Sequence, residues 1–290
     1  MSTLSRVLVL VLLLYPGLTW AADCEDPKPL RFALIPKKNA ELQLAEYQPL
    51  IQVLEMTLER RIKIVYTASY GTVVEGLLAG NIDLAELGPA SFVQADVRDS
   101  SITAFAAFTG RIGPFTDSGT SYRSLLIVRR DRGFSSIASL RDSSVSLIDP
   151  ASTSGALLPR HSFAKLTGVP LDRYFKRVTY AGSHDRAIQA VHKGLVDAAF
   201  VSSSRLDEAV RKGGVRTDEV AVLWKSSPIP FNPFVYRGRL CQPLVERIKQ
   251  AFFRESAVLQ DMFRALDREG FVAVDDDHYL GIREIFSSPP

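Results

Sequence analysis

The stretch Gly80–Ala85 reads GNIDLA, and 114 residues later Gly194–Ala199 reads GLVDAA. Each copy follows a helix-like segment, carries an aspartate three residues after its glycine, and continues into an apolar strand. Tyr70 and His184 stand in the polar turns that begin the two units, at the same offset. This repeat predicts two similar lobes. The alternative is coincidence between two common helix–glycine–strand units.

Strand-like runs alternate with helix-like ones along the chain. The strand-like runs are Leu30–Pro36, Ile62–Thr67, Ile82–Leu87, Leu125–Arg129, Val145–Asp149 and Ala198–Ser202. The helical pattern is clearest where apolar residues recur at 3.6-residue spacing, at Tyr47, Leu50, Ile51, Leu54 and Leu58. Such alternation is typical of α/β proteins. We predict that each lobe is a mostly parallel sheet flanked by helices, with a ligand cleft between the lobes.

Residues 1–21 have the features of a signal peptide. Arg6 provides a positive n-region, Val7–Leu14 is an apolar run, and Thr19-Trp20-Ala21 is an acceptable cleavage site. We therefore expect export to the periplasm and cleavage after Ala21 or Ala22, with an uncleaved anchor as the alternative. The rest of the chain divides into the first part of lobe 1 (22–118), lobe 2 (119–224), and a crossover with return to lobe 1 (225–290).

Two segments are expected to cross between the lobes. They are Gly119–Ser124 and the proline-rich Trp224–Tyr236, which cannot form a regular helix. The second crossing would return two C-terminal helices, about Gln242–Phe253 and Val258–Asp267, to lobe 1.

The net charge of the chain indicates its type of partner, and its two cysteines indicate a possible disulfide. The formal net charge is +3, and removal of Arg6 with the leader leaves +2. So mild a charge argues against nucleic acid as a partner and slightly favours a small anion. Two cysteines, Cys24 and Cys241, would meet an oxidising compartment, where a disulfide between them is plausible. Two unpaired thiols are the alternative.

The turn Ser152-Thr153-Ser154-Gly155 is the strongest candidate for a binding site. It lies between a strand (Val145–Asp149) and an expected helix (about Ala156–Leu166), so hydroxyls and free backbone N–H groups meet at the positive end of a helix dipole. A plain helix N-cap is the alternative. Ligands of open parallel sheets bind outside the carboxyl ends of strands, where Tyr70 and His184 also fall.

Four motifs in order resemble the periplasmic phosphonate/phosphate/phosphite-binding proteins of ABC transporters. They are Gly80–Ser91 (GNIDLAELGPAS), Asp149–Gly155 (DPASTSG), Gly182–Asp185 (GSHD) and Trp224–Ser226 (WKS), and the likeness spans Leu30 to about Ile285. The resemblance implies a type II-like periplasmic binding protein, whose two lobes close over a small anion and present it to a membrane permease.

The resemblance also implies the residues that bind the ligand. Hydroxyls of Ser152, Thr153 and Ser154 and the imidazole of His184 would hold the oxyanion head. Tyr70 would line the opposite wall, together with Phe92, where the family usually has tyrosine. The full expected set is Ser152, Thr153, Ser154, Gly155, His184, Tyr70, Phe92 and Ser91. These donors can satisfy an oxyanion without arginine or lysine, and His184 would add pH sensitivity near neutrality.

Two positions bear on selectivity. Relatives that recognise aminoalkylphosphonates place acidic residues where this chain has Ser204 and Asn232. A buried ligand ammonium would lose its counter-charges here. We expect phosphite, phosphate or a short phosphonate without an amino group, and poor binding of 2-aminoethylphosphonate.

Other functions fit the sequence less well. Ser154, His184 and Asp185 are the residue types of a hydrolytic triad, but Asp185 directly follows His184 and no G-x-S-x-G elbow is present. The histidines (His161, His184, His192 and His278) lack metal-ligand spacing, and no phosphate-binding loop occurs, so we expect neither metal nor cofactor. We expect a monomer that delivers an oxyanion to an ABC permease. The alternatives are a sensor subunit that reports to a membrane histidine kinase, and a structural role.

Overall fold

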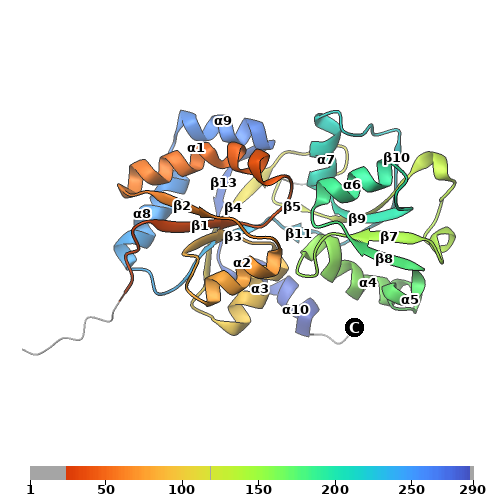
Figure 1. Cartoon of the computed structure of the whole chain (residues 1–290), viewed down its shortest axis with the longest axis horizontal. Helices are drawn as coiled ribbons and strands as arrows, with labels where there is room; N and C mark the ends of the chain where they lie inside the picture. The colour runs from red at the N-terminus through yellow and green to blue at the C-terminus, as the bar shows by residue number, and fades with distance from the viewer. Residues whose placement is uncertain (1–23, 118, 288–290) are drawn as a thin grey trace, which may run out of the picture.

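Two lobes lie side by side in the computed structural model, which describes residues 24–117 and 119–287 (Figure 1). The first and last parts of the chain form one lobe, and the middle part forms the other. The expected signal peptide lies outside the described residues. Within those ranges, no helix has both the length and the apolar character that a membrane crossing requires.

Lobe 1 is built on a six-stranded sheet of order β13-β4-β12-β3-β1-β2. Its strands are β1 (Leu30–Leu34), β2 (Ile62–Val65), β3 (Leu84–Glu86), β4 (Thr103–Gly110), β12 (Pro233–Tyr236) and β13 (Arg268–Ala273). Its helices are α1 (Ala40–Leu58), α2 (Tyr70–Leu78), α3 (Pro89–Arg98), α8 (Gln242–Phe253), α9 (Ala257–Leu266) and α10 (Leu280–Ser287). The helix α1 packs against α8 and α9 over one face of the sheet.

Lobe 2 is built on a five-stranded sheet of order β10-β6-β9-β7-β8. Its strands are β6 (Ser124–Arg129), β7 (Ser144–Leu147), β8 (Arg177–Tyr180), β9 (Ala198–Ser202) and β10 (Val220–Lys225). Its main helices are α4 (Leu158–Thr167), α5 (Leu171–Tyr174), α6 (His184–His192) and α7 (Ser203–Arg211). Short helical turns are η1 (Arg130–Arg132), η2 (Ala138–Leu140) and η3 (Thr153–Leu157), with η4 (Asp276–Tyr279) in lobe 1. Along β9, Ala199 and Val201 pack on α6 whereas Phe200 contacts Phe163 of α4, as the two-residue period of a strand requires.

Both sheets are mixed. In lobe 1, β1 pairs in parallel with β2 and β3, and in lobe 2, β7 pairs in parallel with β8 and β9. The strands that adjoin the crossings run the other way: β12 is antiparallel to β3 and β4, and β6 is antiparallel to β9 and β10. The parallel pattern therefore holds within each repeated unit, and it is broken by the crossing strands and by β13, which is antiparallel to β4.

The 114-residue repeat is a structural repeat. Gly80 and Gly194 each follow a helix with φ of +69°, a conformation that favours glycine. The buried carboxylate of Asp83 accepts hydrogen bonds from the backbone and side chain of Arg31 on β1. In lobe 2, Asp197 accepts equivalent bonds from the backbone and hydroxyl of Ser144 on β7. Each aspartate thus fixes the start of a parallel strand pair.

The lobes are joined by a two-stranded ribbon of β5 (Ser121–Tyr122) and β11 (Ile229–Pro230). Each strand lies within one of the two expected crossing segments. The ring of Tyr122 stacks on Phe231 with centroids 5.5 Å apart, so an aromatic pair stiffens the ribbon beside the cleft. Far from the cleft, a disulfide joins Cys24 to Cys241, with the two Cα atoms 4.7 Å apart.

Candidate ligand-binding cleft

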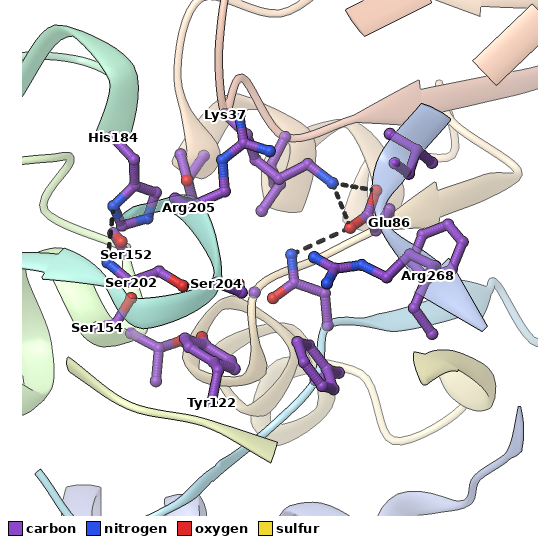
Figure 2. A pocket seen from close by; sticks show the side chains of 18 of the residues that line it. Lys37, Glu86, Tyr122, Ser152, Ser154, His184, Ser202, Ser204, Arg205 and Arg268 are labelled. Atoms are coloured by element: carbon purple, nitrogen blue, oxygen red, sulfur yellow. Dashed lines mark hydrogen bonds and ion pairs between the residues drawn. The ribbon is translucent and has the colours of Figure 1, made fainter. Parts of the chain in front are cut away.

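A small cavity of about 50 Å³ lies between the lobes. Lobe 2 and the ribbon contribute Tyr122, Ser152, Thr153, Ser154, His184, Ser202, Ser204, Arg205, Phe231 and Asn232. Lobe 1 contributes Ile35, Lys37, Tyr47, Tyr70, Glu86, Gly88, Phe108, Leu266 and Arg268. Figure 2 shows the serines and His184 on one side, facing Glu86 and Arg268 on the other.

The hydroxyl-rich turn forms the lobe 2 wall. Ser152 caps η3: its Oγ accepts from Gly155 N at 3.2 Å, which leaves its O–H free to donate into the cavity. Ser154 lies within the first turn, where backbone N–H groups have no helical acceptor. Both side chains are buried and line the cavity. This wall therefore presents hydroxyl donors at a helix N-terminus, which suits an oxyanion.

His184 lies beside this wall as a neutral donor. Its Nδ1 accepts from Ser202 N at 3.2 Å, which assigns the ring proton to Nε2. Burial, with further contributions from Arg205 and Lys37, lowers the pKa of His184 to about 3. The expectation that His184 changes charge near neutral pH is therefore wrong, because nearby cations and the loss of water disfavour the imidazolium.

The aromatic walls differ from the expected ones. Tyr70 lines the cavity as expected, but the second phenol is that of Tyr122 from the ribbon. Burial raises the pKa of both phenols, so they remain neutral. Phe92 does not reach the cavity: its ring is fully buried within lobe 1, against Tyr279, with centroids 5.2 Å apart. Phe92 lies on the face of α3 that packs into the core of lobe 1, and its ring therefore does not reach the cavity.

Three other expected residues act mainly in structure. A Cβ on Gly155 would lie 2.1 Å from the Cγ1 of Ile148, so this glycine allows the helix to approach its strand and does not line the cavity. Ser91 Oγ donates to Ala151 O at 2.9 Å, away from the cavity wall. Thr153 does line the cavity, and its Oγ1 accepts from Ala90 N at 2.8 Å.

Cations also line the cavity, although the expected set of binding residues contained no lysine or arginine. Lys37 Nζ donates to both oxygens of Glu86, at 2.5 and 2.7 Å, and to Tyr47 Oη at 2.8 Å. Asn232 Nδ2 donates to the same carboxylate at 3.1 Å. Burial lowers the pKa of Lys37, although Glu86 opposes that shift. Glu86 is thus held and neutralised at the lobe 1 wall.

Arg205 brings a second cation. Its guanidinium is buried and forms an ion pair with Glu208. A second ion pair joins Arg205 Nη2 to Asp185 Oδ1 at 3.1 Å. The Nε of Arg205 has no acceptor within the described residues. Glu208 also pairs with Lys38 and Lys212. Burial alone would raise the pKa of Glu208. The positive charges of Arg205 and Lys38 stabilise the carboxylate more strongly, so the pKa of Glu208 is lowered.

Arg268, at the start of β13, is the third cation. Its guanidinium lies over the ring of Phe231, 4.9 Å from the centroid. The carboxylate of its neighbour Asp267 points toward Arg111 and Arg211 instead, at 3.9 and 3.8 Å. Within the described residues, no carboxylate forms an ion pair with Arg268.

Sequence patterns could have revealed some of these missed residues. Lys37 follows the first strand directly, and Arg205 follows the strand Ala198–Ser202, so both lie at carboxyl ends of strands. Glu86 is an acid within the mostly apolar run Ile82–Leu87, where a buried charge would need a reason. Arg268 had no such signal, because β13 was not predicted.

The geometry does not assemble a hydrolytic triad. Asp185 contacts Arg205, and the Nδ1 of His184 accepts from the Ser202 backbone. In a triad, the Nδ1–H of the histidine donates a hydrogen bond to the carboxylate of the acid.

Hydrogen bonds and ion pairs hold the two lobes together across the cleft. The backbone N of Tyr70 donates to Asp149 Oδ2 at 3.2 Å, alongside the Ala90–Thr153 bond. At the other rim, Lys212 Nζ donates to Glu46 Oε1 at 2.9 Å. These contacts describe a closed cleft. Two α/β lobes closed over a small polar cavity define a substrate-binding protein.

Comparison with known proteins gives the family. The profile of the ABC transporter phosphonate periplasmic substrate-binding proteins matches residues 32–279, and the chain belongs to this family. It is similar to the phosphate-import protein PhnD of Mycolicibacterium smegmatis, at 29% identity over 89% of this chain and 85% of that protein. It is also similar to the phosphonates-binding periplasmic protein of Escherichia coli K12, at 28% identity over 90% and 77% of the two chains.

A solved structure shows the same fold. The binding protein component of an ABC phosphonate transporter from Pseudomonas aeruginosa aligns with a TM-score of 0.80 at 23% identity, covering 90% of this chain and 86% of that one. The family consists of substrate-binding transport proteins of the periplasm and is not an enzyme family.

Proposed function

We propose that this protein closes over a phosphonate-type oxyanion in the periplasm and delivers it to an ABC permease. The observation that carries the proposal is the wall of Ser152, Ser154 and His184, which presents neutral donors at a helix N-terminus inside a closed cleft. Neutral donors match the oxygens of such a head group and still permit its release. The names of the two relatives, one a phosphate importer and one a phosphonate binder, support this class of ligand.

The ligand range follows from the charges around the cavity. Ser204 and Asn232 line it without a charge, and the carboxylate of Glu86 is already occupied by Lys37. An ammonium group would therefore find no free acid. We propose phosphite, phosphate or a short phosphonate without an amino group as the ligand, with 2-aminoethylphosphonate binding poorly.

Isothermal titration calorimetry tests the head-group assignment. Methylphosphonate, phosphite and phosphate are titrated into the wild type, the Ser154→Ala variant and the Ser139→Ala variant. A hydrogen bond to a charged ligand is worth about 1.5–3 kcal/mol, so Ser154→Ala is expected to weaken binding about 10- to 100-fold. Ser139 is exposed, and within the described residues its hydroxyl bonds only to Ser136, so Ser139→Ala is the matched control. Equal affinities in all three proteins would overturn the assignment.

Genetics tests delivery. Deletion of the gene is expected to abolish uptake of the ligand that binds in calorimetry, and Ser154→Ala should restore uptake poorly. Unchanged uptake with loss of a transcriptional response would instead support the sensor role.

A further inference from the structure

Arg268 lies on the side of the cavity opposite the head-group wall. Figure 2 shows its side chain extending from lobe 1, while Ser152, Ser154 and His184 lie on the far side. A ligand held by its head at the serine wall would therefore direct its remaining atoms toward lobe 1.

The three cations that line the cavity are not equally balanced by acids. Lys37 is neutralised by Glu86, and Arg205 is neutralised by Glu208 and Asp185. Arg268 alone among the cations that line the cavity has no acid partner in the described ranges. A guanidinium has five N–H donors, and within the described residues those of Arg268 reach one protein acceptor, the backbone oxygen of Asp267, at 3.5 Å from Nη1.

The surroundings hold this guanidinium in place. It lies over Phe231 at 4.9 Å and near Phe108 at 5.9 Å from the ring centroids. Aromatic faces position a guanidinium by cation–π attraction and leave its edge donors open. Because those donors form a planar fork, they match the two oxygens of a carboxylate.

We propose, on the basis of the function proposed above, that the natural ligand is a phosphonate whose tail ends in a second anionic group such as a carboxylate. The serine wall binds the phosphonate head, and Arg268 binds the tail. The same arrangement opposes a cationic tail, because an ammonium would meet Arg268 while Glu86 stays paired with Lys37. Arg268 is thus a specificity residue of the site.

The test compares two ligands that differ only in tail charge. Phosphonoacetate carries a carboxylate, and phosphonoacetamide replaces it by an uncharged amide of nearly the same shape. Calorimetry at low ionic strength is expected to show phosphonoacetate binding at least tenfold more tightly to the wild type. Methylphosphonate, which has no tail group, reports the head contacts alone.

Variants then test whether Arg268 causes the preference for phosphonoacetate over phosphonoacetamide. Arg268→Met keeps an unbranched apolar side chain but removes the charge, and is expected to reduce the preference for phosphonoacetate to twofold or less. Its affinity for methylphosphonate, which has no tail group to meet Arg268, is expected to fall by a smaller factor than its affinity for phosphonoacetate. Arg268→Lys should retain part of the preference. Arg111→Gln removes an arginine that pairs with Asp267 outside the cavity, and should behave like wild type.

The possible results separate failure of the anionic-tail proposal from failure of the proposed function. Equal binding of the two ligands by the wild type, with methylphosphonate bound, would overturn the anionic tail and leave the proposed function intact. A parallel loss of phosphonoacetate and methylphosphonate in Arg268→Met, with unchanged thermal unfolding, would move Arg268 to the head group and overturn the tail assignment. If phosphite or phosphate binds to the folded wild type but no phosphonate does, the tail inference fails alone. If none of these anions binds, the proposed function fails as well.

Discussion

His184 shows how strongly the environment of one residue controls its chemistry. The side chain is 5% exposed, and burial with nearby Arg205 and Lys37 lowers its pKa to about 3. In the unfolded chain an imidazole has a pKa of about 6.5. Between these two values the unfolded state binds the extra proton, so lowering the pH favours unfolding. The stabilising effect is complete above about pH 6.5 and is lost as the pH falls toward 3.

A pH series of unfolding curves measures this linkage. From pH 6.5 to pH 4, His184 is expected to remove about 2–3 kcal/mol from the free energy of unfolding of the unliganded protein. His184→Asn retains an acceptor for Ser202 N but cannot titrate, so its free energy of unfolding should fall less over that range. Urea denaturation at each pH gives both values. Parallel curves for the two proteins would show that His184 is not the titrating group.

At the scale of elements, helix α7 links the ligand wall to the rim of the cleft. Arg205 on this helix lines the cavity, and Glu208, one turn later, binds Lys38 from lobe 1. Lys212, just after the helix, binds both Glu208 and Glu46. The Lys38–Glu208 and Lys212–Glu46 pairs join the lobes, so they stabilise the closed form relative to an open one.

Removal of one rim contact should shift that equilibrium. Lys212 is 45% exposed in its side chain, and an ion pair of this kind contributes about 0.2–1 kcal/mol. Lys212→Met is therefore expected to weaken methylphosphonate binding about two- to fivefold in calorimetry, without contact with the ligand. Lys193→Met, an exposed lysine after α6 away from the rim, is the control. An affinity of Lys212→Met equal to that of the control would exclude a role for this contact in closure.

At the scale of the whole molecule, the disulfide ties the beginning of the described chain to its return into lobe 1. Cys24 and Cys241 are 217 residues apart and are flanked by backbone bonds between Glu25 and Arg239 and between Cys241 and Glu25. A crosslink over so long a loop restricts the unfolded chain. It lies outside the residues that line the cavity.

Replacement of both cysteines by serine is expected to lower the free energy of unfolding by about 2–4 kcal/mol. The affinity for methylphosphonate should stay within twofold of wild type. Denaturant unfolding and calorimetry measure the two quantities on the same preparation. A large loss of affinity in a folded variant would contradict the separation of this crosslink from the cleft.

Local patterns in the sequence were sufficient for much of this architecture. The helices expected at about Gln242–Phe253 and Val258–Asp267 form at Gln242–Phe253 and Ala257–Leu266. The repeat around Gly80 and Gly194 forms matching units in the two lobes. These features depend on residues close in sequence, through periodicity, caps and left-handed glycines, which is why they could be predicted.

What the sequence by itself determined was the hydroxyl-rich turn at the end of a strand and the two-lobe repeat that gives it an opposing wall. The tertiary structure alone decided the charges of the cavity, because Lys37, Arg205 and Arg268 come from elements far apart in the chain. It also placed Phe92 in the core and Tyr122 in the site. A binding wall within one turn is local and visible in a sequence, whereas the balance between cations and acids exists only after distant segments have packed.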